Sequence, residues 1–162
     1  MDSDRIKIFR ITDYAIALHV TMHPALKPVL AEDGGDFGMP NIVDEYWIGT
    51  EIDGKLAGCF RICPQGKTVY QIHTYFIPGF RKFADDLGDK VSLWAIEHLP
   101  DFNSFTCMVP VCFENVLKHV DRKGFHRIGT FKEAYFYSGK LVDIAIFQID
   151  KKEIMRLING RL

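Results

Sequence analysis

The alternation of apolar and polar side chains is clearest between residues 68 and 77, where β-branched and aromatic residues dominate. That composition is typical of a half-buried strand. Pro78 and Gly79 interrupt the run, and apolar residues then recur every three or four positions up to Leu99, which is the spacing of one helix face. Pro100 follows, and the residue before a proline is disfavoured in a helix. The pattern therefore predicts a strand, a turn and a helix at the centre of the chain.

The same patterns predict strands and helices on both sides of this central unit. Asp53 and Gly54 lie between two alternating runs and predict a tight hairpin. Asp13 is placed to cap a helix, and Gly124 is placed to end one in the left-handed conformation. Residues 23–40 are rich in Gly, Pro and Asp and are predicted to be irregular. The predicted strands are 5–11, 45–50, 56–62, 68–77, 102–109, 129–137 and 141–149, and the other predicted helices are 14–22, 113–123 and 151–162.

Length and charge narrow the class of protein. A chain of 162 residues is the size of one domain, and 20 Lys and Arg against 21 Asp and Glu give no overall attraction to nucleic acid or to an anionic membrane. The N-terminus is acidic and lacks a signal-peptide core, and no apolar stretch approaches the roughly 20 residues of a membrane span. We therefore expect a cytoplasmic protein with neither nucleic acid nor membrane as a partner.

The four cysteines do not indicate a metal site. Cys59 and Cys63 are four residues apart within a predicted strand, which separates them by about 13 Å. Cys107 and Cys112 flank Pro110 and form no Cys-x-x-Cys loop. A structural zinc site needs four close ligands, so reduced and partly buried thiols are predicted instead.

The order of elements and several short motifs resemble the GCN5-related N-acetyltransferases, the GNAT superfamily. The hairpin that ends at Gly58 is similar to that family's "dG.lvG" hairpin, residues 68–97 to its acetyl-CoA strand and helix, and residues 113–125 to its helix ending in "klGF". Within the superfamily the chain most resembles small phage-encoded GNAT-like proteins, through Ile72-His73-Thr74 and the hairpin at 139–143.

The resemblance implies an α/β (α+β) fold and two substrates. Residues 1–162 are expected to form a single GNAT-like domain with a mixed, mostly antiparallel sheet of about seven strands flanked by helices. A cleft is expected between the fourth and fifth strands, where the two parallel strands splay apart. Acetyl-CoA is the implied co-substrate, and an amine-bearing molecule is the implied acceptor.

A basic turn at the start of the central helix is the predicted seat for the phosphates of acetyl-CoA. Free N–H groups and the positive end of the dipole favour an anion there, and Arg81 and Lys82 add charge. This turn resembles the pyrophosphate loop of active GNAT proteins, which has the form Arg/Gln-x-x-Gly-x-Gly/Ala. Asp86 stands where the loop has its second small residue and Asp85 adjoins it, and these carboxylates would repel a pyrophosphate if they faced it. The predicted cofactor-binding residues are Arg81, Lys82, Phe83 and Ala84, and the two carboxylates are Asp85 and Asp86.

Three further residues are candidates for binding the thioester and its arm. Backbone N–H groups near Phe76 and Ile77 are expected to polarise the thioester carbonyl. Asn115, at the start of the helix after the fifth strand, is a candidate to bond the pantetheine arm, or it is simply a helix-start residue.

The predicted general base is His73, because histidine titrates near neutrality and this one is central in the acetyl-CoA strand. The alternative is a buried histidine that bonds a neighbouring element, and Glu45 and Glu51 are weaker candidates for the base. The tyrosine that protonates the thiolate in many family members is replaced by Val120. Tyr135 is the predicted substitute, with Tyr137 beside it, although tyrosines in strands are usually packing residues.

Two functions follow from the resemblance. The first is an acetyl-CoA-dependent N-acetyltransferase acting on an amine. The second is a GNAT fold without catalysis that serves as a phage structural or interaction protein, in the host cytoplasm or in the virion. The sequence identifies neither the acceptor nor the oligomeric state.

Overall fold

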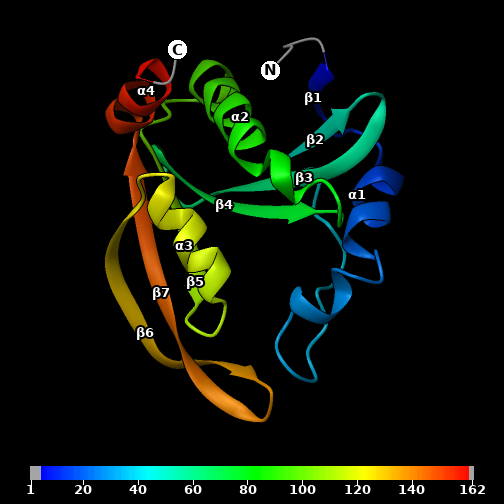
Figure 1. Ribbon diagram of the computed structural model, residues 1–162, viewed down its shortest axis with the longest axis vertical. Helices are drawn as coiled ribbons and strands as arrows, with labels where there is room; N and C mark the ends of the chain where they lie inside the picture. Colours follow the sequence, from blue (N-terminus) through cyan, green and yellow to red (C-terminus); the bar gives the residue numbers. More distant parts are fainter. Residues whose placement is uncertain (1–4, 161–162) are drawn as a thin grey trace.

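The computed structural model describes residues 5–160, which form one seven-stranded sheet flanked by helices (Figure 1). The strand order is β1-β2-β3-β4-β5-β7-β6, and every neighbouring pair is antiparallel except β4 and β5. This confirms the mixed, mostly antiparallel sheet that was expected. The strands are β1 (Ile6–Arg10), β2 (Tyr46–Ile52), β3 (Lys55–Pro64), β4 (Val69–Phe76), β5 (Ser104–Pro110), β6 (His126–Tyr137) and β7 (Lys140–Asp150).

The helices begin and end near the expected residues. Asp13 accepts a hydrogen bond from the Ala15 N–H at 2.9 Å and caps the first helix, while Gly124 follows the third with a φ of 81°. The segment predicted to be irregular contains one short 3-10 turn. The last two residues of the predicted final helix and residues 1–4 lie outside the described residues. The helices are α1 (Tyr14–Thr21), η2 (Lys27–Val29), η3 (Arg81–Phe83), α2 (Ala84–His98), α3 (Glu114–Arg122) and α4 (Lys151–Asn159).

Two tight hairpins fix the register of the outer strands. Asp53 and Gly54 join β2 to β3 with φ values of 52° and 74°, and Ser138 and Gly139 join β6 to β7 with 51° and 75°. Two successive positive φ angles match the right-handed twist of the strands. The hairpin that Asp53 and Gly54 predict is therefore confirmed.

The core has a layer on each face of the sheet. On one face α2 and α4 pack against apolar residues of the central strands, for example Leu87 against Ile48 and Phe60. On the other face α1 and the segment after it cover Trp47 and Tyr75, which alternate with the first set. Between residues 5 and 160, no helix is long and apolar enough to cross a bilayer.

The two parallel strands separate after a short paired stretch. Backbone pairing joins Val69 to Ser104 and continues only as far as Gln71 and Thr106, although β4 runs on to Phe76. The two strands are therefore paired at their N-terminal ends and splayed at their C-terminal ends. We call the space between the C-terminal parts of β4 and β5 the split, and it is the cleft that the sequence predicted.

Candidate active site

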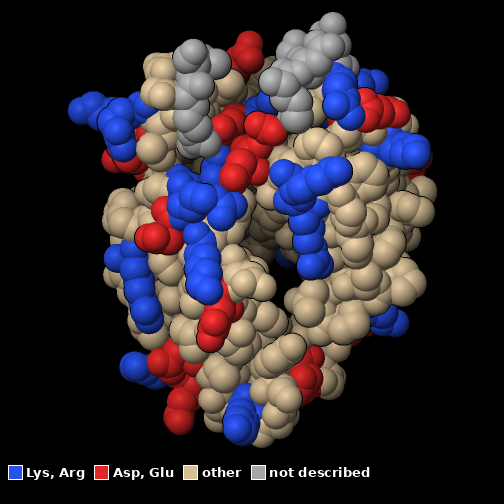
Figure 2. Space-filling model, viewed as in Figure 1, with Lys and Arg blue, Asp and Glu red and all other residues tan. Residues whose placement is uncertain are grey.

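The split leaves the middle of β4 open on both faces of the sheet. Thr74 is exposed and Ile72 and His73 are partly exposed, although β4 lies at the centre of seven strands. Ile72 and Thr74 point to the face that carries α2, and His73 points to the opposite face. Figure 2 shows the surface hollowed between the side of α2 and α3 and the side of α1 and η2, with Lys and Arg on both sides of the hollow.

The main chain of β4 presents hydrogen-bonding groups to the split. The Ile77 N–H donates to the Ala57 carbonyl at 2.9 Å, so the odd-numbered residues of this strand turn their main-chain groups toward β3. The N–H and C=O groups of Ile72, Thr74 and Phe76 therefore point toward the split, where no strand of the described chain pairs with them. Because the Ile77 N–H already donates to Ala57, it is not available to a thioester carbonyl. Of the two N–H groups expected to polarise that carbonyl, only the one of Phe76 points toward the split.

The front opening, on the face of α2 and α3, is basic. Arg81 and Lys82 lie exposed in η3, directly before α2, and Phe83 and Ala84 are partly exposed behind them. The N–H groups of Phe83 and Ala84 donate to the carbonyls of Phe80 and Arg81, so the expectation of free N–H groups in this turn is wrong for these two residues. The turn lies at the end of β4 from which the open main-chain edge begins.

The two carboxylates after this turn, Asp85 and Asp86, differ in their partners and in their exposure to solvent. Asp85 accepts a hydrogen bond from Arg122 of α3 at 3.2 Å and lies 3.5 Å from the imidazole of His119. Burial alone would raise the pKa of Asp85, but the hydrogen bond and charge of Arg122 outweigh it and hold the pKa below its ordinary value. Lys123 donates to the main-chain carbonyl of the same residue at 3.1 Å. The charge of Asp85 is therefore balanced by α3, whereas Asp86 is exposed.

Two other predicted positions lie on α3. Asn115 is exposed in the first turn of α3. Val120 is buried against Cys107 and Phe147. The residue that replaces the family's tyrosine thus belongs to the core.

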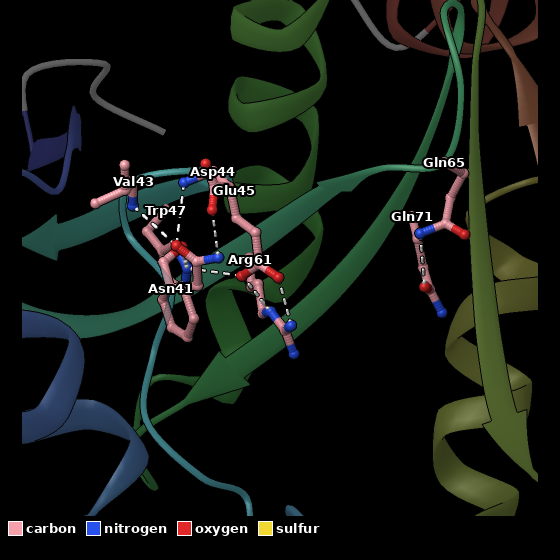
Figure 3. A network of polar contacts seen from close by, with 8 residues as sticks. All are labelled: Asn41, Val43, Asp44, Glu45, Trp47, Arg61, Gln65 and Gln71. Atoms are coloured by element: carbon pink, nitrogen blue, oxygen red, sulfur yellow. Dashed lines mark hydrogen bonds and ion pairs between the residues drawn. The ribbon is translucent and has the colours of Figure 1, made fainter.

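The back opening is lined by a network of polar side chains (Figure 3). Arg61 of β3 donates twice to the Glu45 carboxylate, at 2.7 and 2.5 Å, and the Trp47 indole N–H donates to the same carboxylate at 3.2 Å. Gln65 donates to Gln71 at 3.3 Å. These groups border a hollow of about 520 Å³. Its lining consists of Asn41, Asp44, Glu45, Arg61, Cys63, Pro64, Gln65, Gln71 and His73.

His73 lies in this hollow as a neutral imidazole. Its ring stacks on Tyr75, with ring centroids 6.4 Å apart, and it is paired across the sheet with Arg61. Burial, reinforced by the Arg61 charge, lowers the pKa of His73 to about 4. The expectation from the sequence that His73 titrates near neutrality is therefore wrong. At pH 7 the imidazole is free to accept a proton or a hydrogen bond, but it is a weak base.

The other catalytic candidates are divided between this hollow and more distant sites. Glu45 lines the hollow, but Glu51 lies by the β2–β3 hairpin, 3.9 Å from Lys7. Tyr135 contacts Phe113 and Tyr137 near the other hairpin, and burial together with nearby Cys112 raises its pKa. The two predicted catalytic residues, His73 and Tyr135, thus belong to different clusters.

Sequence reasoning did not single out Arg61, Gln71 or Thr74. Arg61 had a signal, because it is the one charged residue between Leu56 and Cys63 in an otherwise apolar strand. Its partner Glu45 is 16 residues away, and nothing local connects them. The exposure of Thr74 follows from the split and not from the sequence around it.

The described residues contain no metal cluster. Residues 5–160 hold no group of three His, Cys, Asp or Glu side chains placed to bind an ion, and the four cysteines are free thiols. Three are buried and Cys112 is partly exposed.

Comparison with known proteins identifies the family and the fold. Residues 6–159 match a family described as "Protein of unknown function (DUF2824)", and the chain belongs to that family. No curated protein matches it. The fold is that of GNAT acetyltransferases. The spermidine N-acetyltransferase of Vibrio cholerae, solved with CoA and spermine, is 12% identical with a TM-score of 0.78, covering 94% of this chain and 99% of that one. A probable acetyltransferase is 14% identical with a TM-score of 0.70, covering 93% and 96%.

Proposed function

We propose that this protein is an acetyl-CoA-dependent N-acetyltransferase that acetylates an amine. The observation that carries the proposal is the split, which opens one strand to both faces of the sheet. Two substrates entering from opposite faces would meet at the edge of β4. That arrangement would hold the two reactants in contact, as a transfer reaction requires.

The front opening fits acetyl-CoA. The open N–H and C=O groups of Ile72, Thr74 and Phe76 suit an extended amide-containing arm, as an added strand would. The charges of Arg81 and Lys82 suit the pyrophosphate at the beginning of α2, whereas the N–H groups of Phe83 and Ala84 donate to the carbonyls of Phe80 and Arg81. Asn115, exposed on α3, is a proposed partner for the same arm. The ion pairs of Asp85 with α3 remove one of the two charges that would oppose this binding.

The back opening fits the amine. The amine nitrogen attacks the thioester carbonyl carbon, the new N–C bond forms, and the C–S bond breaks to release CoA as a thiolate. His73 accepts the proton that the nitrogen gives up, and the Phe76 N–H stabilises the carbonyl oxygen as charge develops. Tyr135 of β6 is the proposed acid for the thiolate, because a tyrosine hydroxyl carries a proton at neutral pH.

The likeness to solved acetyltransferases supports the proposal at the level of the fold. One of those structures contains CoA and spermine, which shows that this architecture holds both kinds of substrate in that protein. A function still depends on the site and not on the fold alone. The alternative, a fold retained for contacts within a phage particle, stays a prediction.

The test is release of CoA thiol from acetyl-CoA in the presence of a panel of amines that includes spermine. We expect amine-dependent release by the wild type and its loss in Thr74→Trp, which places an indole in the split. Thr12→Trp, at an exposed position before α1, is the matched control and should keep the activity. Absence of thiol release with every amine, together with absence of acetyl-CoA binding, would contradict the proposal.

A further inference from the structure

The face of β5, β7 and β6 that lies opposite α3 carries a group of exposed and partly exposed apolar side chains, beside the polar pair of Thr106 and Gln148. Burial alternates along β7: Ala145 and Phe147 are buried under α3, whereas Ile144 and Ile146 are partly exposed. Met108 of β5 pairs with Ile146 and is 39% exposed, and Phe131 of β6 pairs with Ile144 and is 51% exposed. A sheet face in contact with water normally carries polar side chains. We call Met108, Phe131, Ile144 and Ile146 the apolar wall.

The apolar wall begins at the split, on the side of β5 and on the same face of the sheet as His73. The last parallel pair is Gln71 with Thr106, so two residues further on His73 and Met108 point to the same face on opposite sides of the split. On the other face, Ile72 packs with the cluster that contains Cys107, as the same register requires. The back opening therefore has a polar wall, formed by β3, β4 and the segment before β2, which lines the hollow. The apolar wall on β5, β7 and β6 lies across the split from it.

The charges of the two walls restrict what fits between them. The polar wall holds the carboxylates of Asp44 and Glu45 against one guanidinium, that of Arg61, and a neutral His73. This excess of negative charge disfavours an acceptor that carries a carboxylate. None of the four residues of the apolar wall has a polar group, so a wholly hydrophilic acceptor would leave that wall in water.

We infer that the acceptor is an amphipathic amine, with its amino group at His73 and an apolar chain or ring against the apolar wall. This inference rests on the proposed transferase function and adds the class of substrate. Met108 is then a specificity-determining residue, because it lies nearest the reacting nitrogen. Phe131, farther along the wall, contacts only longer apolar groups.

The test is a titration of unbranched primary alkylamines, from butylamine to octylamine, into the protein with and without CoA. Each methylene buried on the apolar wall should raise the affinity two- to fourfold, up to the value for a fully buried CH₂. Met108→Gln together with Phe131→Gln should remove this dependence on chain length. Leu93→Gln is the matched control, since Leu93 is 40% exposed on α2, and it should keep the dependence. Thermal melts confirm that all variants are folded.

The outcomes separate this inference from the proposed function. A wild type whose affinity does not rise with chain length overturns the inference, and so does a dependence that survives in the double variant. Chain-length dependence without any acetyl transfer would support the wall as a ligand surface and contradict the transferase proposal. Sedimentation decides the remaining alternative. A wild-type dimer that the double variant dissociates, with no dependence on chain length, would assign the wall to a second copy of the chain and overturn the inference.

Discussion

The front and back openings of the split differ in charge, in origin and in what their backbone offers. The front opening combines a helix N-terminus with Arg81 and Lys82, and the basic end of α3 lies beside it. The back opening combines Glu45 and Arg61 with a neutral His73 and an apolar wall. The front is suited to an anion with an extended arm, and the back to an uncharged or cationic amine. Under the proposed function, the sheet would separate two substrates that would otherwise compete for the same groups.

The largest expected effect is on turnover at the back opening. His73→Ala should lower kcat by about 10²-fold, the lower end of the usual range for a positioned proton acceptor, because a pKa of about 4 makes His73 a weak base. Acetyl-CoA affinity should change little. The measurement is thiol release at saturating acetyl-CoA, with His126→Ala on the exposed start of β6 as the control. An unchanged kcat in His73→Ala would remove His73 from the reaction.

The matching change at the front opening should affect binding and not the chemical step. Arg81→Ala should weaken acetyl-CoA binding by about 1.5–3 kcal/mol, the range for hydrogen bonds to charged groups. Calorimetry at low salt measures it, and Lys55→Ala on the β2–β3 hairpin is the control. Equal affinities in Arg81→Ala and the wild type would place the phosphates elsewhere.

Both openings depend on the close contact of β3 with β4 at Gly58, where φ is +152°. A Cβ there would lie 2.1 Å from the Tyr75 carbonyl oxygen and 2.9 Å from the Phe76 Cα. Gly58→Ala should therefore destabilise the fold by about 1–3 kcal/mol, the cost of overpacking a well-packed site. Gly66→Ala meets nothing within 4 Å and should be nearly neutral. Urea denaturation compares the two, and equal midpoints would contradict this account.

The free energy of unfolding should decrease as the pH falls, because of His73 in the back opening. The pKa of His73 is about 4 in the fold, against an ordinary value of 6.5. As pH falls below 6.5, the unfolded chain binds the proton first, so the free energy of unfolding declines until the pH reaches about 4. Denaturation at about pH 7 and about pH 5 should show a smaller decline in His73→Gln than in the wild type. Equal declines would mean that the histidine is not buried as described.

The smallest expected effect concerns the exposed carboxylate at the front. Because Asp86 is exposed, Asp86→Gly should change acetyl-CoA affinity by only a few-fold, since solvent screens its charge. Titration of both proteins at low salt measures the ratio. Improvement of tenfold or more on substitution would indicate that this carboxylate faces the phosphates and would favour the non-catalytic alternative.

Local signals in the sequence were sufficient for most of the fold. The Asp53–Gly54 hairpin, the Asp13 cap and the change of period after Pro78 each depend on residues that are adjacent in the chain, and each is present in the structure. The split was expected from the resemblance, because no local pattern tells where two parallel strands part.

The candidate site was only partly predictable, since its contacts join distant residues. Glu45 was one of several weak candidates until Arg61, in another strand, fixed its position. The apolar wall could not be predicted from the sequence, because Met108 and Ile146 are neighbours only through the pairing of β5 with β7. Similarly, the low pKa of His73 comes from burial and from Arg61, neither of which a sequence shows.

The most direct test of this account is a calorimetric titration of acetyl-CoA into the wild-type protein at low and at moderate salt. The account predicts one site per chain, with an affinity that falls as salt screens the basic turn at Arg81 and Lys82. Thr74→Trp, which fills the split, should abolish the heat of binding. Absence of binding at millimolar acetyl-CoA, or binding that Thr74→Trp leaves intact, would contradict the claim that the split holds the co-substrate.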